Sequence, residues 1–109
     1  MIFLALLLVL GAMGIQSPPA PGKPKSVEQT HTIVIKGFQF VPERLEVSAG
    51  DTVVWKNADI VPHTATAKKS FDSKNLNKGQ SWRFKTRQKG SFPYSCAYHP
   101  TMQGELFVR

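Results

Sequence analysis

Alternation of polar and apolar residues with a period of two is the feature that most constrains the fold of this chain. Residues 44–48 (RLEVS) change between polar and apolar at every step, and residues 81–85 (SWRFK) do the same. Successive side chains of a β-strand point to opposite faces, so this pattern is typical of strands with one buried face. The chain shows no convincing amphipathic helix, and 8 Gly and 8 Pro among 109 residues disfavour a helical bundle.

Five further segments are predicted as strands: 31–36 (HTIVIK), 52–56 (TVVWK), 63–68 (HTATAK), 90–96 (GSFPYSC) and part of 104–109 (GELFVR). Residues 49–51 (AGD) give a hairpin-like turn signal before the strand that starts at Thr52. The polar segment 69–79 is predicted as a crossing loop. About seven to eight short strands separated by turns predict an all-β fold, specifically an antiparallel Greek-key β-sandwich.

The N-terminal residues differ in composition from the rest of the chain. The apolar run that starts at Ile2 is shorter than the roughly 20 residues that a membrane span needs, and Ala12-Met13-Gly14 has the small-x-small pattern of a signal-peptidase site. Four prolines within residues 17–25 are typical of an extended tether, and a segment merely left over after cleavage is the equal alternative. The predicted parts are a signal peptide or N-terminal anchor (1–14), a Pro-rich tether (15–30) and a folded domain (31–109). The predicted location is exported, periplasmic or extracytoplasmic, with membrane tethering by the N-terminus as the alternative to cleavage.

The single cysteine excludes an internal disulfide and every zinc site that needs two or more cysteines. Cys96, His99 and Met102 follow one another at intervals of three, which would also suit one face of a helix. Pro93 and Pro100 disfavour a helix here, because an interior proline removes a hydrogen bond and clashes with the preceding turn. The segment is therefore predicted as a tight loop after a strand, with Cys96 entering from the core side.

A fourth candidate ligand, His63, lies 33 residues before Cys96. A sandwich brings distant strand ends together at one pole, so the two can meet. Two imidazoles, a thiolate and a thioether favour copper, since a trigonal His₂Cys set with a weak axial Met is the blue-copper arrangement, whereas zinc has little use for the thioether. Taken singly, Cys96 or Met102 would more often be a core residue. Their joint spacing predicts a site for one copper ion, Cu(I)/Cu(II), held by His63, Cys96, His99 and Met102.

The sequence resembles the cupredoxins, specifically their plastocyanin and amicyanin branch. The resemblance covers residues 31–109, and its motifs are residues 50–55 (GDTVVW), Pro62-His63, residues 89–96 (KGSFPYSC) and Cys96-x₂-His99-x₂-Met102. It implies that His63, Cys96 and His99 form the equatorial plane of the copper site, with Met102 as the long axial contact.

The resemblance also implies roles for the neighbours of these ligands. In this family the residue after the first histidine is often Asn, which ties the loop of that histidine to the loop that carries the other ligands. In this chain the corresponding residue is Thr64. A backbone N–H of Thr64 could still donate to the Cys96 sulfur. The second histidine is the more exposed ligand in the family and serves as the electron port, here surrounded by Pro62, Pro100, Tyr98 and Ile60.

These residues predict a carrier rather than an enzyme, because only His31, read as a surface histidine, is left to build a second, catalytic copper site. The favoured function is single-electron shuttling, as a monomer, between a redox protein donor and acceptor that are exported or membrane-bound. Two alternatives stay open: a copper-binding protein for metal delivery, storage or resistance, and an apo sandwich with a structural or adhesive role. No Met-rich or His-rich stretch supports delivery.

The formal net charge is +7 and the pI about 9.9, which predicts an anionic partner or surface. Nucleic acid is not expected, because no groove-reading or base-stacking motif is present. The basic residues that follow one another between Lys68 and Lys89 form either a solvated face or a docking surface for an acidic redox partner or an anionic membrane. The basic residues concerned are Lys68, Lys69, Lys74, Lys78, Lys85, Arg87 and Lys89.

Overall fold

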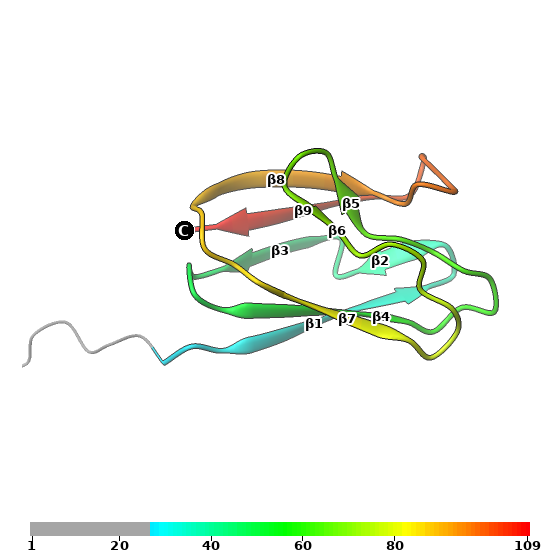
Figure 1. The fold of residues 1–109 in the computed structure, drawn as a ribbon, viewed down its shortest axis with the longest axis horizontal. Helices are drawn as coiled ribbons and strands as arrows, with labels where there is room; N and C mark the ends of the chain where they lie inside the picture. The colour runs from blue at the N-terminus through cyan, green and yellow to red at the C-terminus, as the bar shows by residue number, and fades with distance from the viewer. Residues whose placement is uncertain (1–26) are drawn as a thin grey trace, which may run out of the picture.

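The computed structural model describes residues 27–109, so the predicted signal peptide and most of the predicted tether lie outside the described residues. The chain folds into two β-sheets packed face to face (Figure 1), which confirms the predicted all-β sandwich. Its strands are β1 (Thr30–Lys36), β2 (Gln39–Val41), β3 (Arg44–Val47), β4 (Thr52–Asn57), β5 (Thr66–Ala67), β6 (Phe71–Asp72), β7 (Ser81–Lys85), β8 (Gly90–Ser95) and β9 (Gln103–Val108).

Both sheets are mixed, whereas the sequence pattern predicted an antiparallel sandwich. One sheet has the order β2-β1-β4-β7 and the other β3-β9-β8-β5-β6. The pairs β1/β4 and β3/β9 are parallel, and the remaining pairs are antiparallel. Alternation shows which face of a strand is buried, but it carries no information about the direction of the neighbouring strand.

The structure has two strands more than the seven segments predicted. β2 was not predicted, and β6 lies inside the segment 69–79 that was predicted as a loop. Strands of two or three residues contain too few alternating positions to be recognised from periodicity. The predicted strand 63–68 is also shorter than expected, because only Thr66–Ala67 joins a sheet while His63 forms an isolated bridge with Leu76.

The predicted hairpin turn at residues 49–51 is wrong, because these residues cross from one sheet to the other. β3 belongs to the five-stranded sheet and β4 to the four-stranded sheet. The buried carboxylate of Asp51 fixes this crossing by accepting hydrogen bonds from the backbone N–H groups of Gln29 (3.0 Å) and Ser48 (3.0 Å). It also bonds His31 Nε2 at 2.9 Å, so His31 is a paired, partly buried residue and not the surface histidine expected.

Replacing Asp51 with Asn is expected to destabilise the domain at pH 7 by about 2 kcal/mol, since hydrogen bonds to a charged group are lost. The N–H group of Gln29 and the side chain of His31 hold the pKa of Asp51 below its usual 3.8, against the opposing effect of burial. The stabilisation is therefore complete above about pH 4 and is lost as the pH falls through the lowered pKa. Urea unfolding from pH 7 to pH 2 should show a shallower acid loss in D51N than in the unaltered chain.

The core between the sheets positions two loops at one pole. Trp55 in β4 is fully buried and contacts Tyr94 in β8 edge to face at 5.5 Å. Each of these two residues lies near the end of its strand, and each strand leads into a segment that carries predicted ligands. Asn57, at the end of β4, is fully buried and begins the loop to His63; Cys96 follows the last residue of β8. The packing of β4 against β8 therefore sets the distance between the two loops.

Candidate metal centre

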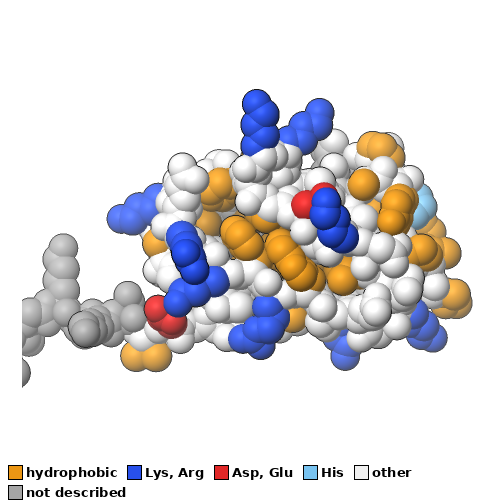
Figure 2. All heavy atoms as spheres, viewed as in Figure 1, with side chains coloured by type: hydrophobic (Ala, Val, Ile, Leu, Met, Phe, Trp, Pro, Cys, Tyr) orange, Lys and Arg blue, Asp and Glu red, His pale blue; other side chains and the backbone are white. Residues whose placement is uncertain are grey.

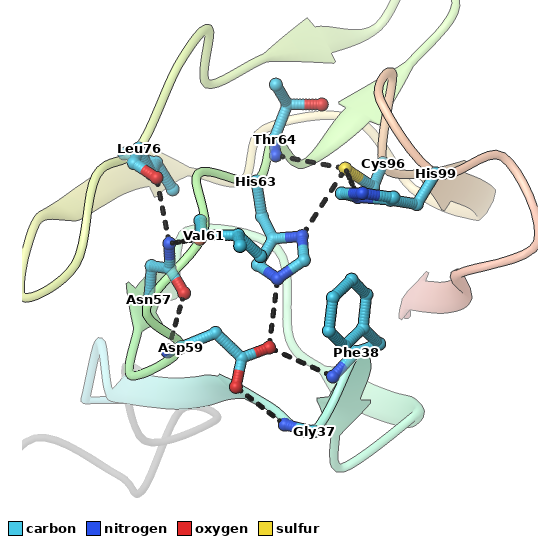
Figure 3. Close-up of polar contacts among 10 residues, drawn as sticks. All are labelled: Gly37, Phe38, Asn57, Asp59, Val61, His63, Thr64, Leu76, Cys96 and His99. Atoms are coloured by element: carbon cyan, nitrogen blue, oxygen red, sulfur yellow. Dashed lines mark hydrogen bonds and ion pairs between the residues drawn. The ribbon is translucent and has the colours of Figure 1, made fainter.

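His63 is held in place by the buried side chain of Asn57. The Asn57 amide donates to the carbonyl of Val61 at 2.9 Å and to that of Leu76 at 2.8 Å (Figure 3). The backbone N–H and C=O of His63 then pair with the C=O and N–H of Leu76. These bonds tie the loop after β4 to the segment before β7, and His63 is fully buried as a result.

Cys96 lies between two imidazole rings. Its sulfur is 3.7 Å from Nδ1 of His63 and 3.7 Å from Nδ1 of His99, and the three potential ligand atoms all lie within 4.8 Å of one another. Cys96 is fully buried, as the face pattern of its strand predicted, and His99 is partly exposed. The structure thus brings together three of the four predicted ligands from segments 33 residues apart.

The spacing of these atoms suits one trigonal ion. Bonds of about 2.0 Å to nitrogen and 2.3 Å to sulfur, separated by 120°, would place the two atoms about 3.7 Å apart. The observed nitrogen–sulfur distances are both 3.7 Å. The donor set and both nitrogen–sulfur distances therefore fit a copper ion.

Met102 is buried beside this cluster, and its backbone closes the loop that begins at Cys96. Its N–H donates to the carbonyl of His99 at 2.8 Å, and its carbonyl accepts from the N–H of Cys96 at 3.1 Å. The segment has turns and bends rather than a helix, as its two prolines predicted. The role of the Met102 thioether as an axial ligand stays a prediction.

Thr64 joins the two ligand loops with both its backbone and its side chain. Its N–H donates to the Cys96 sulfur at 3.4 Å, and its hydroxyl oxygen accepts from the N–H of Ala97 at 2.7 Å. Figure 3 shows the first of these bonds, from the Thr64 N–H to the Cys96 sulfur. The sequence indicated the backbone bond but not the hydroxyl bond. A Thr at this position therefore supplies a side-chain tie between the loops.

Asp59 is a residue of this site that the sequence analysis missed. Its Oδ2 bonds Nε2 of His63 at 2.9 Å, while its carboxylate also accepts from the N–H groups of Gly37 (2.8 Å) and Phe38 (2.9 Å) (Figure 3). Burial acts to raise the pKa of Asp59, but the hydrogen bonds from Phe38, Gly37 and His63 outweigh it and hold the pKa below 3.8. An ionised carboxylate only accepts, so Nε2 is the ring nitrogen that donates to Asp59, and Nδ1 is the ring nitrogen that faces Cys96.

Phe38 is the second residue that was missed. Its ring meets the rings of His63 and His99 edge to face, with centroid distances of 5.1 and 5.0 Å. Its backbone has a φ of 58°, which is rare for a bulky residue, and the bond from its N–H to Asp59 secures that conformation. No sequence pattern indicated that the turn after β1 would reach the ligands.

Exposed apolar side chains gather around the ligand loops. Phe38 is 49% exposed, Tyr98 50% and Ile60 85%, and Pro62 and Pro100 are also exposed. Figure 2 shows apolar atoms at the end of the molecule where histidine atoms reach the surface. The predicted patch is therefore present, and Phe38 belongs to it. No helix among residues 27–109 is long and apolar enough to cross a membrane.

Comparisons with known proteins agree with this site. A family model described as "Cupredoxin-like domain" matches residues 1–108. The chain is 29% identical over 80 residues to amicyanin from Paracoccus versutus, covering 68% of this chain and 61% of that protein. It is 34% identical over 77 residues to plastocyanin from Vicia faba, covering 58% of this chain and 78% of that protein.

A solved structure extends the comparison to a larger protein. Cu-containing nitrite reductase from Thermus scotoductus SA-01 superposes with a TM-score of 0.70 at 26% identity, covering 73% of this chain and 22% of that one. This chain thus spans less than two thirds of the Paracoccus amicyanin and about a fifth of the reductase. The same fold therefore occurs both in small proteins and inside a protein named as an enzyme.

Proposed function

The chain belongs to the cupredoxin-like domain family, on its plastocyanin and amicyanin branch, and we propose that it is a type 1 (blue) copper protein that carries single electrons. The observation that carries the proposal is the buried Cys96 sulfur, placed 3.7 Å from Nδ1 of each of two histidines. We propose His63, Cys96 and His99 as equatorial ligands and Met102 as the axial ligand. A bound copper ion would supply one-electron exchange between Cu(I) and Cu(II).

The protein residues would keep the site in one geometry. Asp59 orients His63, Thr64 ties the two loops, and the Thr64 N–H donates to the sulfur. Fixed ligands need little movement when the charge of the site changes, and a buried thiolate is shielded from other thiols and from solvent. These features favour a carrier that retains its metal through many redox cycles over one that delivers it.

The exposed patch around His99 favours brief docking to other redox proteins, from which the protein would accept electrons and to which it would donate them. Phe38, Ile60 and Tyr98 supply the apolar contact area. We further propose export to a periplasmic or other extracytoplasmic compartment. The feature that supports export is the predicted signal segment 1–14, which lies outside the described residues.

Copper titration of the purified protein tests the proposal directly. Addition of Cu(II) should give an intense blue or green colour that ascorbate bleaches and reoxidation restores. Cys96→Ser should abolish this absorption, because a hydroxyl cannot replace the thiolate. His31→Gln is the matched control: it changes a histidine bonded to Asp51, away from the proposed ligands, and should keep the colour.

A colourless complex of the unaltered chain, or a colour that decays irreversibly as Cys96 oxidises, would contradict electron shuttling. Removal of copper by a chelator distinguishes shuttling from delivery. A carrier should lose its metal slowly, and a delivery protein should exchange it readily.

A further inference from the structure

The positive charge of this protein comes from one segment. Residues 68–89 contain eight of the fourteen basic residues and one of the seven acidic residues, so the segment carries +7 and the remaining charges balance. Its acidic residue, Asp72, pairs with Lys74 at 3.3 Å, and Lys85 pairs with Glu28 at 3.5 Å. Within residues 27–109, the other basic side chains of the segment form no ion pair: Lys68, Lys69, Lys78, Arg83, Arg87 and Lys89.

This segment lies along the side of the sandwich where the edges of the two sheets meet. β6 is an edge strand of the five-stranded sheet and β7 an edge strand of the four-stranded sheet. Phe71 in β6 contacts Phe84 in β7 with a centroid distance of 4.9 Å, and Trp82 at 6.0 Å. Trp82 and Phe84 are only partly buried, so a seam of aromatic rings is open to solvent there.

Figure 2 shows this side of the molecule. Lys and Arg side chains surround apolar atoms that are visible along the middle, and acidic atoms are few. A groove of about 410 Å³ continues the seam, with Phe84, Phe92 and Val108 among its lining residues and Lys69, Lys85 and Arg87 beside them. We name the exposed surface of residues 68–89 the basic face.

Residues of the basic face form hydrogen bonds with both loops that carry proposed ligands, the loop of His63 and the loop that begins at Cys96. Asn75 lies between Lys74 and Lys78, and its Oδ1 accepts a hydrogen bond of 2.9 Å from the hydroxyl of Tyr98, the neighbour of His99. Leu76, the next residue, pairs with the backbone of His63. A molecule bound over Lys74 and Lys78 would therefore lie beside the exposed ligand His99.

We propose that the basic face is the docking surface for an acidic protein that exchanges electrons with this one, with Lys74 and Lys78 beside the point of transfer. The inference rests on the proposed function. Half-buried aromatic rings within a charged rim are typical of protein interfaces, and complementary charge speeds association and fixes orientation. An anionic membrane fits less well, because the large apolar residues that are exposed, such as Phe38 and Ile60, lie outside residues 68–89.

The first test measures binding without copper. The full-length apoprotein is titrated with poly-L-glutamate, and amide chemical shifts are followed by NMR. The shift changes should concentrate in residues 68–89 and at Tyr98, and binding should weaken as salt is raised from 20 to 200 mM, because exposed charges are screened. Lys74→Gln/Lys78→Gln should weaken binding about fivefold at low salt. The control Lys36→Gln/Lys56→Gln removes the same charge from β1 and β4, outside residues 68–89, and should have much less effect.

The second test measures the transfer itself. Oxidation of the reduced copper protein by ferricyanide, a trianion, should slow about fivefold in K74Q/K78Q at low salt and much less in K36Q/K56Q. Equal effects of the two double variants, or shift changes spread evenly over the surface, would overturn the proposal. Binding to phosphatidylserine vesicles through residues 68–89 without binding to poly-L-glutamate would overturn it in favour of a lipid surface. A chain that binds poly-L-glutamate as expected but forms no coloured copper site would refute the proposed function instead.

Discussion

Replacing Gly104 with alanine is expected to lower the free energy of unfolding by about 3 kcal/mol, the upper range for overpacking a core. Gly104 in β9 lies opposite Tyr94 in β8, and a Cβ at position 104 would overlap the Tyr94 ring. The ring is buried and packs against Phe40 at 4.7 Å and Trp55 at 5.5 Å, so it cannot move aside without displacing these core residues. Thermal unfolding of G104A should occur about 15 °C below that of the unaltered chain.

A double-mutant cycle identifies the cause of this destabilisation. In a Tyr94→Leu background the ring is gone, so Gly104→Ala should cost at least about 1 kcal/mol less than in the unaltered chain. In a Tyr94→Phe background the ring remains, and the cost should persist. Gly79→Ala is a useful comparison, because position 79 has a φ of 83° and no atom near its Cβ, so it reports backbone strain alone. If Gly104→Ala lowers the free energy of unfolding equally in the unaltered chain, in Tyr94→Leu and in Tyr94→Phe, the overlap with the ring is not the cause.

Asp59→Asn is expected to weaken Cu(II) binding about 10- to 100-fold and to raise the reduction potential of the site. The carboxylate holds Nε2 of His63 at 2.9 Å, and loss of such a partner typically has this effect on metal affinity. Removing a negative charge near the metal disfavours Cu(II) more than Cu(I), which sets the direction of the potential change. Chelator competition gives the affinity, and spectroelectrochemistry gives the potential.

Asp72→Asn provides the matched control for charge. It also removes a carboxylate whose pKa lies below 3.8, but Asp72 bonds Thr66 and Lys74 rather than a ligand. The D72N potential should stay close to that of the unaltered protein. If D59N and D72N shift the potential equally, the effect of Asp59 is one of overall charge and not of its bond to His63.

The sequence by itself determined the local features of this protein. Alternation located the long strands, including Ser81–Lys85 with its exact bounds, because one buried face per strand leaves a period of two. The types and spacing of His63, Cys96 and His99 predicted their association, and the structure places them together. The unusual combination of soft and imidazole donors indicated copper, since ligand chemistry is a property of the side chains themselves.

Only the tertiary structure decided what depends on contacts between distant segments. The direction of β1 beside β4, the crossing at Asp51, and the bonds from Gly37 and Phe38 to Asp59 each join residues 20 or more positions apart in the chain. A turn shows nothing in its own sequence of the distant carboxylate that it will meet. Asp59 lies only four residues before His63, but the segment between them forms no regular element whose periodicity would place the two side chains together. Such contacts follow from how the strands pair and how the two sheets pack, so the predicted ligands were visible in the sequence and the groups that orient them were not.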